Sequence, residues 1–235
     1  MPRTSKKPAG TGTTKKRKPS ELAPERVSEI LARLDKRYPK ARCALHHRNA
    51  WELLVATILS AQCTDVRVNL VTPELFRRFP TPQAMADASL PELESLVRTT
   101  GFFRNKAKNI QSTARRVMSD FGGKVPASTE QLLSLPGVAR KTANVVLGSW
   151  YEIAAGVVVD THVYRISRRL GLTQSTSPEK VEEDLMRVIP KDHWIDYSHQ
   201  IIHLGREICI ARKPRCADCF LENLCNSQDK TWRSH

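Results

Sequence analysis

Long apolar stretches are missing from this chain of 235 residues. No run approaches the roughly 20 apolar residues that a membrane-spanning helix requires. No apolar segment of the kind found in secretory signals follows Met1. We therefore expect the protein to stay off the membrane and in a reducing compartment. The six cysteines are then not expected to form a disulfide framework.

Strand-like segments are also scarce, and the few present, such as residues 157–159, do not suffice for a sheet. Apolar residues recur instead at the three- and four-residue spacing of helices, as at Val27, Ile30, Leu31 and Leu34. The sequence therefore predicts an all-α fold with short connections. The longer helices are expected at residues 23–38, 51–62, 105–121, 160–170, 177–188 and 193–209.

One further helix is predicted to begin at Asp65, because aspartate is a favourable N-cap residue. Pro73 is expected to end or kink this helix, since proline removes a backbone donor and clashes with the preceding turn. Leu75, Phe76 and Phe79 continue the apolar pattern beyond the proline.

Acidic residues are in the minority, with 24 Asp and Glu against 38 Lys and Arg and a formal net charge of +14. Residues 1–20 hold seven of the positive charges and no acidic residue. They are too poor in apolar residues to fold, and we expect a disordered tail that serves either as a DNA-binding arm or as a solubilising segment. The remaining chain stays basic, at about +7, which favours nucleic acid or another polyanion as the partner.

The segment from Leu135 to Ala143 reads Leu-Pro-Gly-Val-Ala-Arg-Lys-Thr-Ala. Its Pro-Gly pair predicts a turn, and the residues that follow predict a helix. The free backbone N–H groups at such a helix N-terminus favour an anion. Arg140 and Lys141 fall in the first turn, where positive charge opposes the helix dipole. Two cations in that position indicate an anionic partner, such as phosphate.

Four of the cysteines lie close together in the sequence, in the pattern C-x6-C-x2-C-x5-C, at Cys209, Cys216, Cys219 and Cys225. In a reducing compartment this density indicates a metal centre. Zinc also accepts four cysteines, but zinc sites usually contain two short Cys pairs, and only Cys216 and Cys219 form one here. Cys43 and Cys63 have no spacing partners and are expected to be buried thiols.

The Leu135–Ala143 segment and the cysteine spacing resemble the helix-hairpin-helix and the 4Fe–4S loop of the endonuclease III family of DNA glycosylases. The resemblance extends from Ala23 to Cys225. Ala139 departs from it, because the family pattern has Gly there, and a role that needs a positive φ is not expected at this position. The resemblance implies that the four clustered cysteines hold a 4Fe–4S cluster, which orders a loop of basic residues against DNA.

The resemblance also implies two helical domains on either side of a DNA-binding cleft. A continuous helical domain would span residues 43–153 and include the helix-hairpin-helix at about residues 128–150. A second domain would combine residues 21–42 with residues 154–225 and carry the iron–sulfur cluster loop. Residues 226–235 would form a C-terminal tail.

Lys141 and Asp160 match the catalytic positions of the family. A Lys amine can attack a sugar carbon and form a Schiff base, and burial near Arg140 is expected to favour its unprotonated form. Asp160 would orient the nucleophile, accept protons and stabilise the developing cation. Taken alone, Lys141 could equally be a phosphate contact, and Asp160 is most simply the N-cap of the following helix. Both roles are open to Asp160, because a cap also fixes where its side chain points.

Glycosylases act on a nucleotide flipped out of the base stack. By resemblance, Gln62 fills the vacated space, Phe102 is an apolar wedge on a second loop, and Asp65 lines the base or sugar pocket. Core packing is the alternative for Phe102. The other implied DNA contacts are Gly137, Ala139, Arg140, His162, Arg212, Lys213 and Arg215. Phosphate contacts or solvated positions are expected for Arg104, Lys106, Lys108, Arg165, Arg168 and Arg169.

The resemblance thus implies a bifunctional DNA glycosylase and abasic-site lyase that removes oxidised pyrimidines from duplex DNA in base excision repair. It implies a monomer in the cytoplasm, associated with the bacterial nucleoid. A monofunctional adenine glycosylase is one alternative, disfavoured because Lys141 is present and residues 55–62 carry no carboxylate. A non-catalytic DNA-binding module is another, which the loss of Lys141 or Asp160 would have supported.

Overall fold

The structure is a computed structural model that describes residues 22–232. The predicted basic tail at residues 1–20 lies outside this range. The described residues form α-helices and short 3-10 helices, without a strand among them, so the prediction of an all-α fold is confirmed. No helix within residues 22–232 has the length and apolar character needed to cross a membrane.

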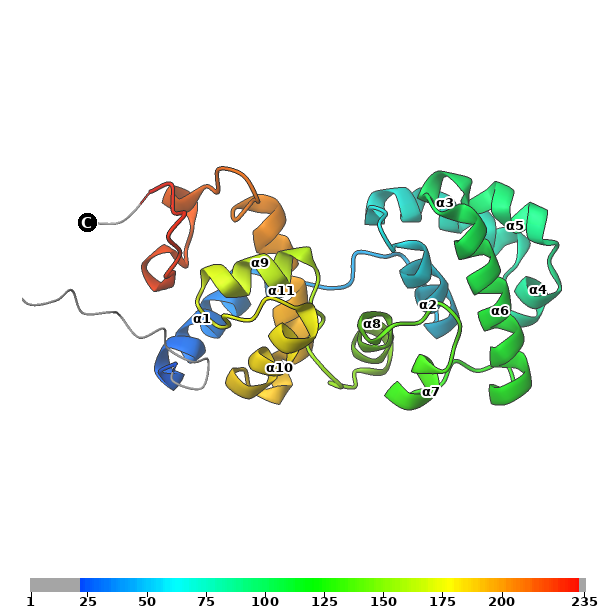
Figure 1. Ribbon diagram of the computed structural model, residues 1–235, viewed down its shortest axis with the longest axis horizontal. Helices are drawn as coiled ribbons and strands as arrows, with labels where there is room; N and C mark the ends of the chain where they lie inside the picture. The colour runs from blue at the N-terminus through cyan, green and yellow to red at the C-terminus, as the bar shows by residue number, and fades with distance from the viewer. Residues whose placement is uncertain (1–21, 233–235) are drawn as a thin grey trace, which may run out of the picture.

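The helices form two groups, which Figure 1 shows side by side. The first group consists of α2 (Ala50–Leu59), α3 (Asp65–Arg78), α4 (Pro82–Asp87), α5 (Leu90–Val97), η2 (Arg98–Thr100), α6 (Phe103–Phe121), α7 (Thr129–Leu133) and α8 (Arg140–Tyr151). The second consists of α1 (Pro24–Arg37), α9 (Thr161–Arg169), α10 (Pro178–Val188), η3 (Lys191–His193), α11 (Trp194–Glu207), η4 (Cys216–Asp218) and η5 (Glu222–Leu224). The chain therefore enters the second group twice, before α2 and after α8.

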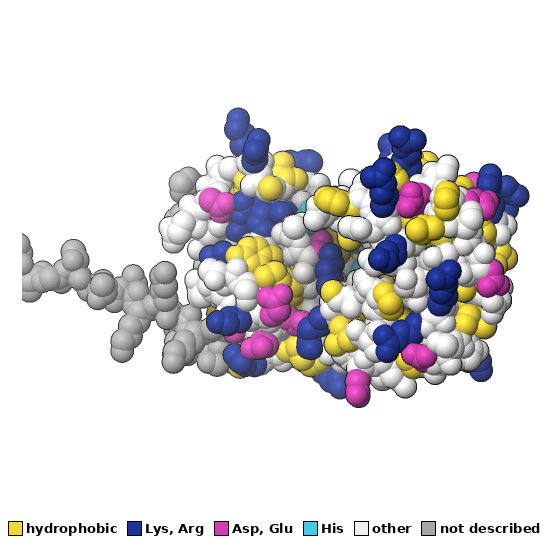
Figure 2. Space-filling view, turned by 45° about the vertical axis from the view of Figure 1, so that its right-hand side comes forward, with side chains coloured by type: hydrophobic (Ala, Val, Ile, Leu, Met, Phe, Trp, Pro, Cys, Tyr) yellow, Lys and Arg dark blue, Asp and Glu magenta, His cyan; other side chains and the backbone are white. Residues whose placement is uncertain are grey.

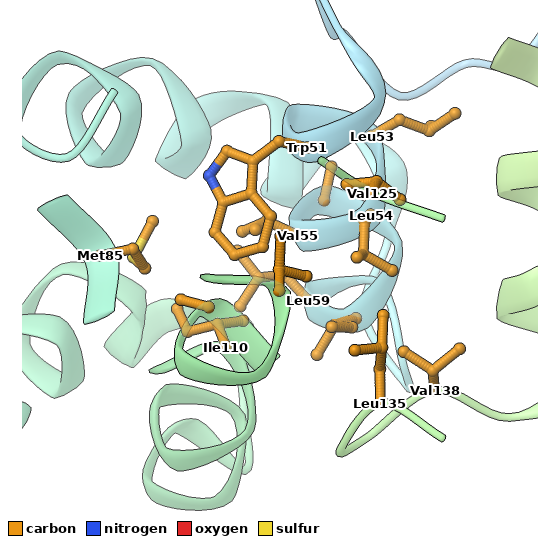
Figure 3. Close-up of a cluster of buried hydrophobic side chains, with 14 of the residues drawn as sticks. Trp51, Leu53, Leu54, Val55, Leu59, Met85, Ile110, Val125, Leu135 and Val138 are labelled. Atoms are coloured by element: carbon orange, nitrogen blue, oxygen red, sulfur yellow. The ribbon is translucent and has the colours of Figure 1, made fainter. Parts of the chain in front are cut away.

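The first group packs around α2, a helix in which every residue is buried. Figure 3 shows Trp51, Val55 and Leu59 of α2 close to Met85 of α4 and Ile110 of α6. A helix that is apolar on nearly all sides can be stable only when other helices cover it. The sequence pattern of α2 thus explains why α3, α6 and α8 pack against it.

The second group has a separate core in which α1 and α11 meet α9 and α10. Tyr197 of α11 lies at its centre, completely buried, and its hydroxyl group shares a hydrogen bond of 2.8 Å with Ser167 of α9. The first core is built from residues between Leu45 and Leu147, and the second from residues 27–41 and 157–221. The exact domain limits of 21–42, 43–153 and 154–225 stay a prediction.

The expected N-cap of α3 and the expected end of this helix at Pro73 are wrong, whereas the alternative of a kink at Pro73 stays a prediction. Thr64, not Asp65, is the N-cap, and its side chain accepts a hydrogen bond from the backbone N–H of Arg67 at 3.3 Å. Asp65 is instead the first helical residue. The helix also continues through Pro73 to Arg78. Burial of Thr72, Leu75 and Phe76 on either side of the proline accounts for this, because packing can outweigh the loss of one backbone hydrogen bond.

Candidate functional site

The turn between α7 and α8 requires glycine at position 137. The backbone of Gly137 has φ +74°, and a Cβ atom there would lie 2.9 Å from the Cβ and Cγ atoms of Asn109 in α6. The hydroxyl group of Thr113, also in α6, donates to the carbonyl of Pro136 at 2.6 Å. Leu135 and Val138 anchor the turn in the first core (Figure 3). The hairpin is therefore held rigidly against α6 at a position only glycine can occupy without strain.

The N-terminus of α8 has no side-chain cap. Ala139 occupies the N-cap position with φ −94°, an ordinary extended conformation, so alanine in place of the family's glycine causes no backbone strain. Arg140 and Lys141 follow in the first turn, and both are exposed. The expectation that Lys141 is buried is wrong for the protein without DNA. Its amine is open to a ligand, next to uncapped backbone N–H groups that favour an anion.

Arg140 is tied to the second group of helices. Its Nε donates to Oε2 of Glu182 in α10 at 2.8 Å, and Nδ2 of Asn144 donates to Oε1 of the same carboxylate at 2.8 Å. Gly156 lies directly against this pair, because a Cβ atom there would collide with the Glu182 carboxylate. Half of the Arg140 side chain remains exposed. The Arg140–Glu182 bridge thus fixes α8 relative to α10, beside Lys141.

Asp160 is the N-cap of α9, as predicted for an aspartate directly before this helix. Its Oδ1 accepts hydrogen bonds from the backbone N–H groups of His162 and Val163, each at 2.8 Å. The hydrogen bonds to Asp160 among the described residues both go to Oδ1. The cap therefore orients the carboxylate while Oδ2 stays available, which makes the two roles considered for Asp160 compatible.

His162 lies in a charged neighbourhood contributed by both groups of helices. Burial lowers the pKa of His162, while Asp160 and Asp65 act to raise it and Arg165 and Arg206 to lower it further. Its ring fits against α11 because position 205 is glycine, where a Cβ atom would collide with the ring. The fold thus brings Asp160 and Asp65 around one imidazole, although the two aspartates are far apart in the sequence.

Asp65 also joins the two groups directly, through an ion pair of 2.6 Å between its Oδ2 and the guanidinium group of Arg206 in α11. Sequence reasoning missed Arg206 and Glu182. Neither belongs to a local motif, and their partners lie 141 and 42 positions away. Several Lys and Arg side chains lie along the boundary between the two lobes in Figure 2.

Two loop tips carry exposed residues in the left-handed backbone region. Gln62, after α2, is exposed with φ +52°, and Phe102, at the N-cap of α6, is 63% exposed with φ +46°. A positive φ is costly for residues other than glycine, and such strain concentrates at functional positions. The core-packing alternative for Phe102 is therefore wrong. The backbone strain at Gln62 and Phe102 could not be read from the residue types.

The buried side chain of Lys106 lies between these two loops, near Thr100 on one side and Cys63 on the other. Its side chain is 4% exposed, and Nζ donates to the carbonyl of Thr100 at 2.7 Å. Burial lowers the pKa of Lys106, and the nearby thiol of Cys63, next to Gln62, partly opposes this. Lys106 is therefore neither a phosphate contact nor a solvated side chain. It supports the Phe102 loop beside the Gln62 loop.

Cys209, Cys216, Cys219 and Cys225 line a single pocket after the end of α11. Burial raises the pKa of Cys219 to about 11, and the other three thiols raise it as well. Burial also raises the pKa of Cys225. Four thiolates cannot share this site without a compensating positive charge, which a bound metal centre would supply.

Arginine side chains of α9 organise the cysteine loop. Arg169 donates to Sγ of Cys209 at 3.3 Å and to the carbonyl of Ile210 at 3.0 Å, and it forms an ion pair with Asp229 at 2.6 Å. Arg165 donates to the carbonyl of Cys209 at 2.9 Å. The prediction that these two arginines face phosphate or solvent is therefore wrong. The exposed cations of this loop are the predicted Arg212, Lys213 and Arg215.

Cys43 and Cys63, expected to be buried, are both half-buried against the first core. Burial raises the pKa of the Cys43 thiol. Both lie outside the four-cysteine pocket, so the metal-centre pattern involves only the C-terminal set.

Residues 55–191 match the HhH-GPD superfamily of base excision DNA repair proteins. Endonuclease III of Synechocystis sp. is 56% identical over 203 residues, which cover 86% of this chain and 93% of its own length. Endonuclease III of Bacillus subtilis is 43% identical over 207 residues, covering 88% and 94%. The similarity therefore includes nearly all of the described helices.

Solved structures give the same result. The endonuclease III chain in a trapped covalent intermediate with DNA is 43% identical and superimposes with a TM-score of 0.82, covering 87% of this chain and 96% of that one. A thermostable thymine-DNA glycosylase, 22% identical with a TM-score of 0.74, shares the fold. Because the superfamily match spans more than half of the sequence and the similar proteins align over most of their length, the chain belongs to the endonuclease III family.

Proposed function

We propose that this chain is a bifunctional DNA glycosylase and abasic-site lyase in which Lys141 is the nucleophile and Asp160 the assisting carboxylate. One observation carries the proposal: Lys141 is exposed in the first turn of α8, at a helix N-terminus without a side-chain cap. A phosphate bound at that terminus would place the sugar next to the amine. Asp160 supports the assignment because its cap hydrogen bonds hold the carboxylate in one orientation.

The reaction follows from these two groups. The unprotonated Nζ of Lys141 attacks C1′ of the damaged nucleotide, and the bond from C1′ to the base breaks, with the electron pair and a proton leaving on the base. Opening of the sugar ring leaves an iminium between Nζ and C1′. Loss of a proton from C2′ then expels the 3′ phosphate by β-elimination, and water hydrolyses the iminium. Asp160 accepts protons and stabilises the cationic sugar during these steps.

The proposed substrate is duplex DNA that carries an oxidised pyrimidine or an abasic site, bound by a monomer at the bacterial chromosome. The exposed and strained Gln62 and Phe102 support this, because a flipped nucleotide leaves a gap that two adjacent loops can fill. The DNA present in the similar endonuclease III complexes supports it independently. Arg140, the free N-terminus of α8, and Arg212, Lys213 and Arg215 are the proposed phosphate contacts, and Asp65 and His162 line the site.

We propose further that Cys209, Cys216, Cys219 and Cys225 hold a 4Fe–4S cluster. A zinc ion with Zn–S bonds of about 2.3 Å would bring its sulfur ligands within about 3.8 Å of one another. No three Cys, His, Asp or Glu side chains within residues 22–232 are arranged to share a single ion, whereas all four thiols line one pocket. When bound, a cluster supplies positive charge and cross-links the loop; the reaction steps involve only Lys141 and Asp160. Purified protein should be yellow-brown and contain iron, and a colourless zinc protein would contradict this assignment.

Borohydride trapping tests the catalytic proposal. Wild type and the Lys141→Gln variant are incubated with duplex DNA containing an abasic site or an oxidised thymine. A covalent adduct with both substrates, absent in the variant although DNA binding persists, is the expected result. An adduct with the abasic site alone would leave a lyase with a different natural base. Absence of an adduct despite tight binding would indicate a monofunctional or non-catalytic relative.

A further inference from the structure

The ion pair between Asp65 and Arg206 bridges the two groups of helices, and the proposed reaction gives Arg206 no part. Asp65 is the first residue of α3, and Arg206 lies in the last turn of α11, in the opposite group (Figure 1). Oδ2 of Asp65 lies 2.6 Å from a guanidinium nitrogen of Arg206, and the two side chains are 28% and 43% exposed. The pair is therefore partly shielded from water, which makes it stronger than a fully exposed ion pair.

This ion pair holds the end of α3 that follows the Gln62 loop. Cys63 and Thr64 are the residues between Gln62 and Asp65. The backbone N–H of Cys63 donates to the carbonyl of Ser60 at 3.0 Å, which closes a turn around Gln62. Thr64 then caps α3. Because a hydrogen-bonded turn and a helix cap connect the two positions, a displacement of Asp65 moves Gln62 as well.

Asn69 holds the same face of α3 one turn further along. Residues four apart lie on one face of a helix, so Asn69 and Asp65 point in the same direction. Nδ2 of Asn69 donates to the carbonyl of Ala44 at 2.8 Å, and its Oδ1 accepts from the backbone N–H of His46 at 2.9 Å. Ala44 and His46 belong to the segment that joins α1 to α2 and so connects the two groups. One face of α3 is therefore fixed to the boundary between the groups.

On the other side of the boundary, Arg206 lies close to the helix that Asp160 caps. The preceding residue is Gly205, where a Cβ atom would collide with the ring of His162. The backbone N–H of His162 donates to Oδ1 of Asp160 at 2.8 Å. The ion pair thus connects the Gln62 loop with the part of the second group that carries the proposed catalytic carboxylate.

We propose that Arg206 is a positioning residue for the proposed reaction, because its pair with Asp65 holds the Gln62 loop in place. Held in this way, the loop can fill the gap in the duplex while the flipped sugar stays at Lys141 and Asp160. The inference rests on the proposed function, since only an enzyme that flips a nucleotide out of a duplex leaves such a gap. A single strand has no paired stack to fill, so the ion pair should not matter there.

Borohydride trapping with one abasic-site oligonucleotide, either single-stranded or in a duplex, tests the proposal. Arg206→Gln should form the adduct with the duplex roughly fivefold more slowly than wild type, as expected for the loss of a partly shielded ion pair. With the single strand its rate should equal that of wild type. Arg206→Lys should recover most of the duplex rate, since an ammonium group can replace a single guanidinium contact. Arg37→Gln is the matched control, because it breaks an ion pair of 3.2 Å with Glu207 inside the second group, and it should match wild type on both substrates.

A binding measurement and a double-mutant cycle separate positioning from a direct phosphate contact by Arg206. Fluorescence anisotropy compares an undamaged duplex with one that carries a tetrahydrofuran abasic analogue, which cannot form a Schiff base. Arg206→Gln should weaken binding to the analogue only, since the gap arises only where a nucleotide is flipped. In trapping, the effects of Asp65→Asn and Arg206→Gln should not multiply in the double variant, because both changes break the same ion pair.

Several outcomes would overturn the proposal. Arg206→Gln would act on the catalytic pair or on folding if it slowed trapping of the single strand as much as that of the duplex. It would remove a phosphate contact if it weakened binding to both duplexes equally, or if its effect multiplied with that of Asp65→Asn. Wild-type rates of Arg206→Gln on both substrates would leave the ion pair without a role in the reaction. Failure of the proposed function itself is distinct, because wild type would then form no adduct with either substrate.

Discussion

Arg140 has two proposed roles: it forms an ion pair with Glu182, and it contacts a DNA phosphate. Substitutions can separate these roles, because Arg140 can bind phosphate and Glu182 cannot. Glu182→Gln and Arg140→Gln both break the same ion pair. Only the second change removes the cation that we propose binds phosphate. We therefore predict that only Arg140→Gln lowers the affinity for DNA, whereas Glu182→Gln lowers the stability of the protein without weakening DNA binding.

The expected loss of stability follows from the contacts. Glu182 is buried and accepts two hydrogen bonds of 2.8 Å, one from Arg140 and one from Asn144. A glutamine at position 182 can keep the bond with Asn144, since its amide oxygen is also an acceptor. The bond to Arg140 is lost, but that side chain is half exposed and can be solvated instead. We expect the free energy of unfolding to fall by about 1–2 kcal/mol.

The effect on DNA binding is measured by fluorescence anisotropy with a labelled abasic-site duplex over a range of salt concentrations. The Lys141→Gln background prevents turnover. In Glu182→Gln the guanidinium group of Arg140 is released, so the affinity should be equal to that of the Lys141→Gln protein alone or higher. In Arg140→Gln the affinity should fall. The plot of log affinity against log salt concentration, which has a negative slope, should become less steep by about 0.9, as expected for the loss of one phosphate contact. Equal losses of affinity in both variants would refute the reasoning, because Arg140 would then act only by positioning α8.

Three other predictions concern single positions. Asp160→Asn should fold normally, since asparagine caps helices as well as aspartate does, yet slow base release in single-turnover assays by about 10²–10⁴-fold. Gly137→Ala should lower the free energy of unfolding by about 1–3 kcal/mol, because of the positive φ and the contact with Asn109. Burial lowers the pKa of His199, so the unfolded chain binds its proton more readily. Stability should therefore fall as the pH drops below about 6.5, by at most about 1.4 kcal/mol per pH unit, and less steeply in His199→Gln.

Each of these three predictions has a control variant or a result that would contradict it. Full activity of Asp160→Asn would leave that residue as a helix cap only. Ala139→Gly, two residues after Gly137, should change stability by no more than about 1 kcal/mol, because φ there is already negative. If it is as harmful as Gly137→Ala, the backbone argument fails. Identical pH profiles of wild type and His199→Gln in thermal denaturation would show that other groups cause the acid sensitivity.

The sequence by itself determined the features that depend on neighbours along the chain. Helix periodicity, the Pro-Gly turn and the cap at Asp160 are local, since contacts between residues a few positions apart decide them. The spacing of the four cysteines is read directly from the sequence. All four emerged from residue types alone. The family resemblance, carried by the same local motifs, was confirmed by the comparisons.

Only the tertiary structure decided which charged side chains bind partners within the protein and which face solvent. Lys106 and Arg169 look like surface cations in the sequence, yet one is buried beneath a loop and the other holds the cysteine loop. The partners of Arg140 and Asp65 also come from helices that are remote in the chain. The physical reason is that a long charged side chain can interact equally well with solvent, with phosphate or with a carbonyl group that is distant in the sequence. The choice among them depends on which surfaces the packed helices bring within about 3 Å.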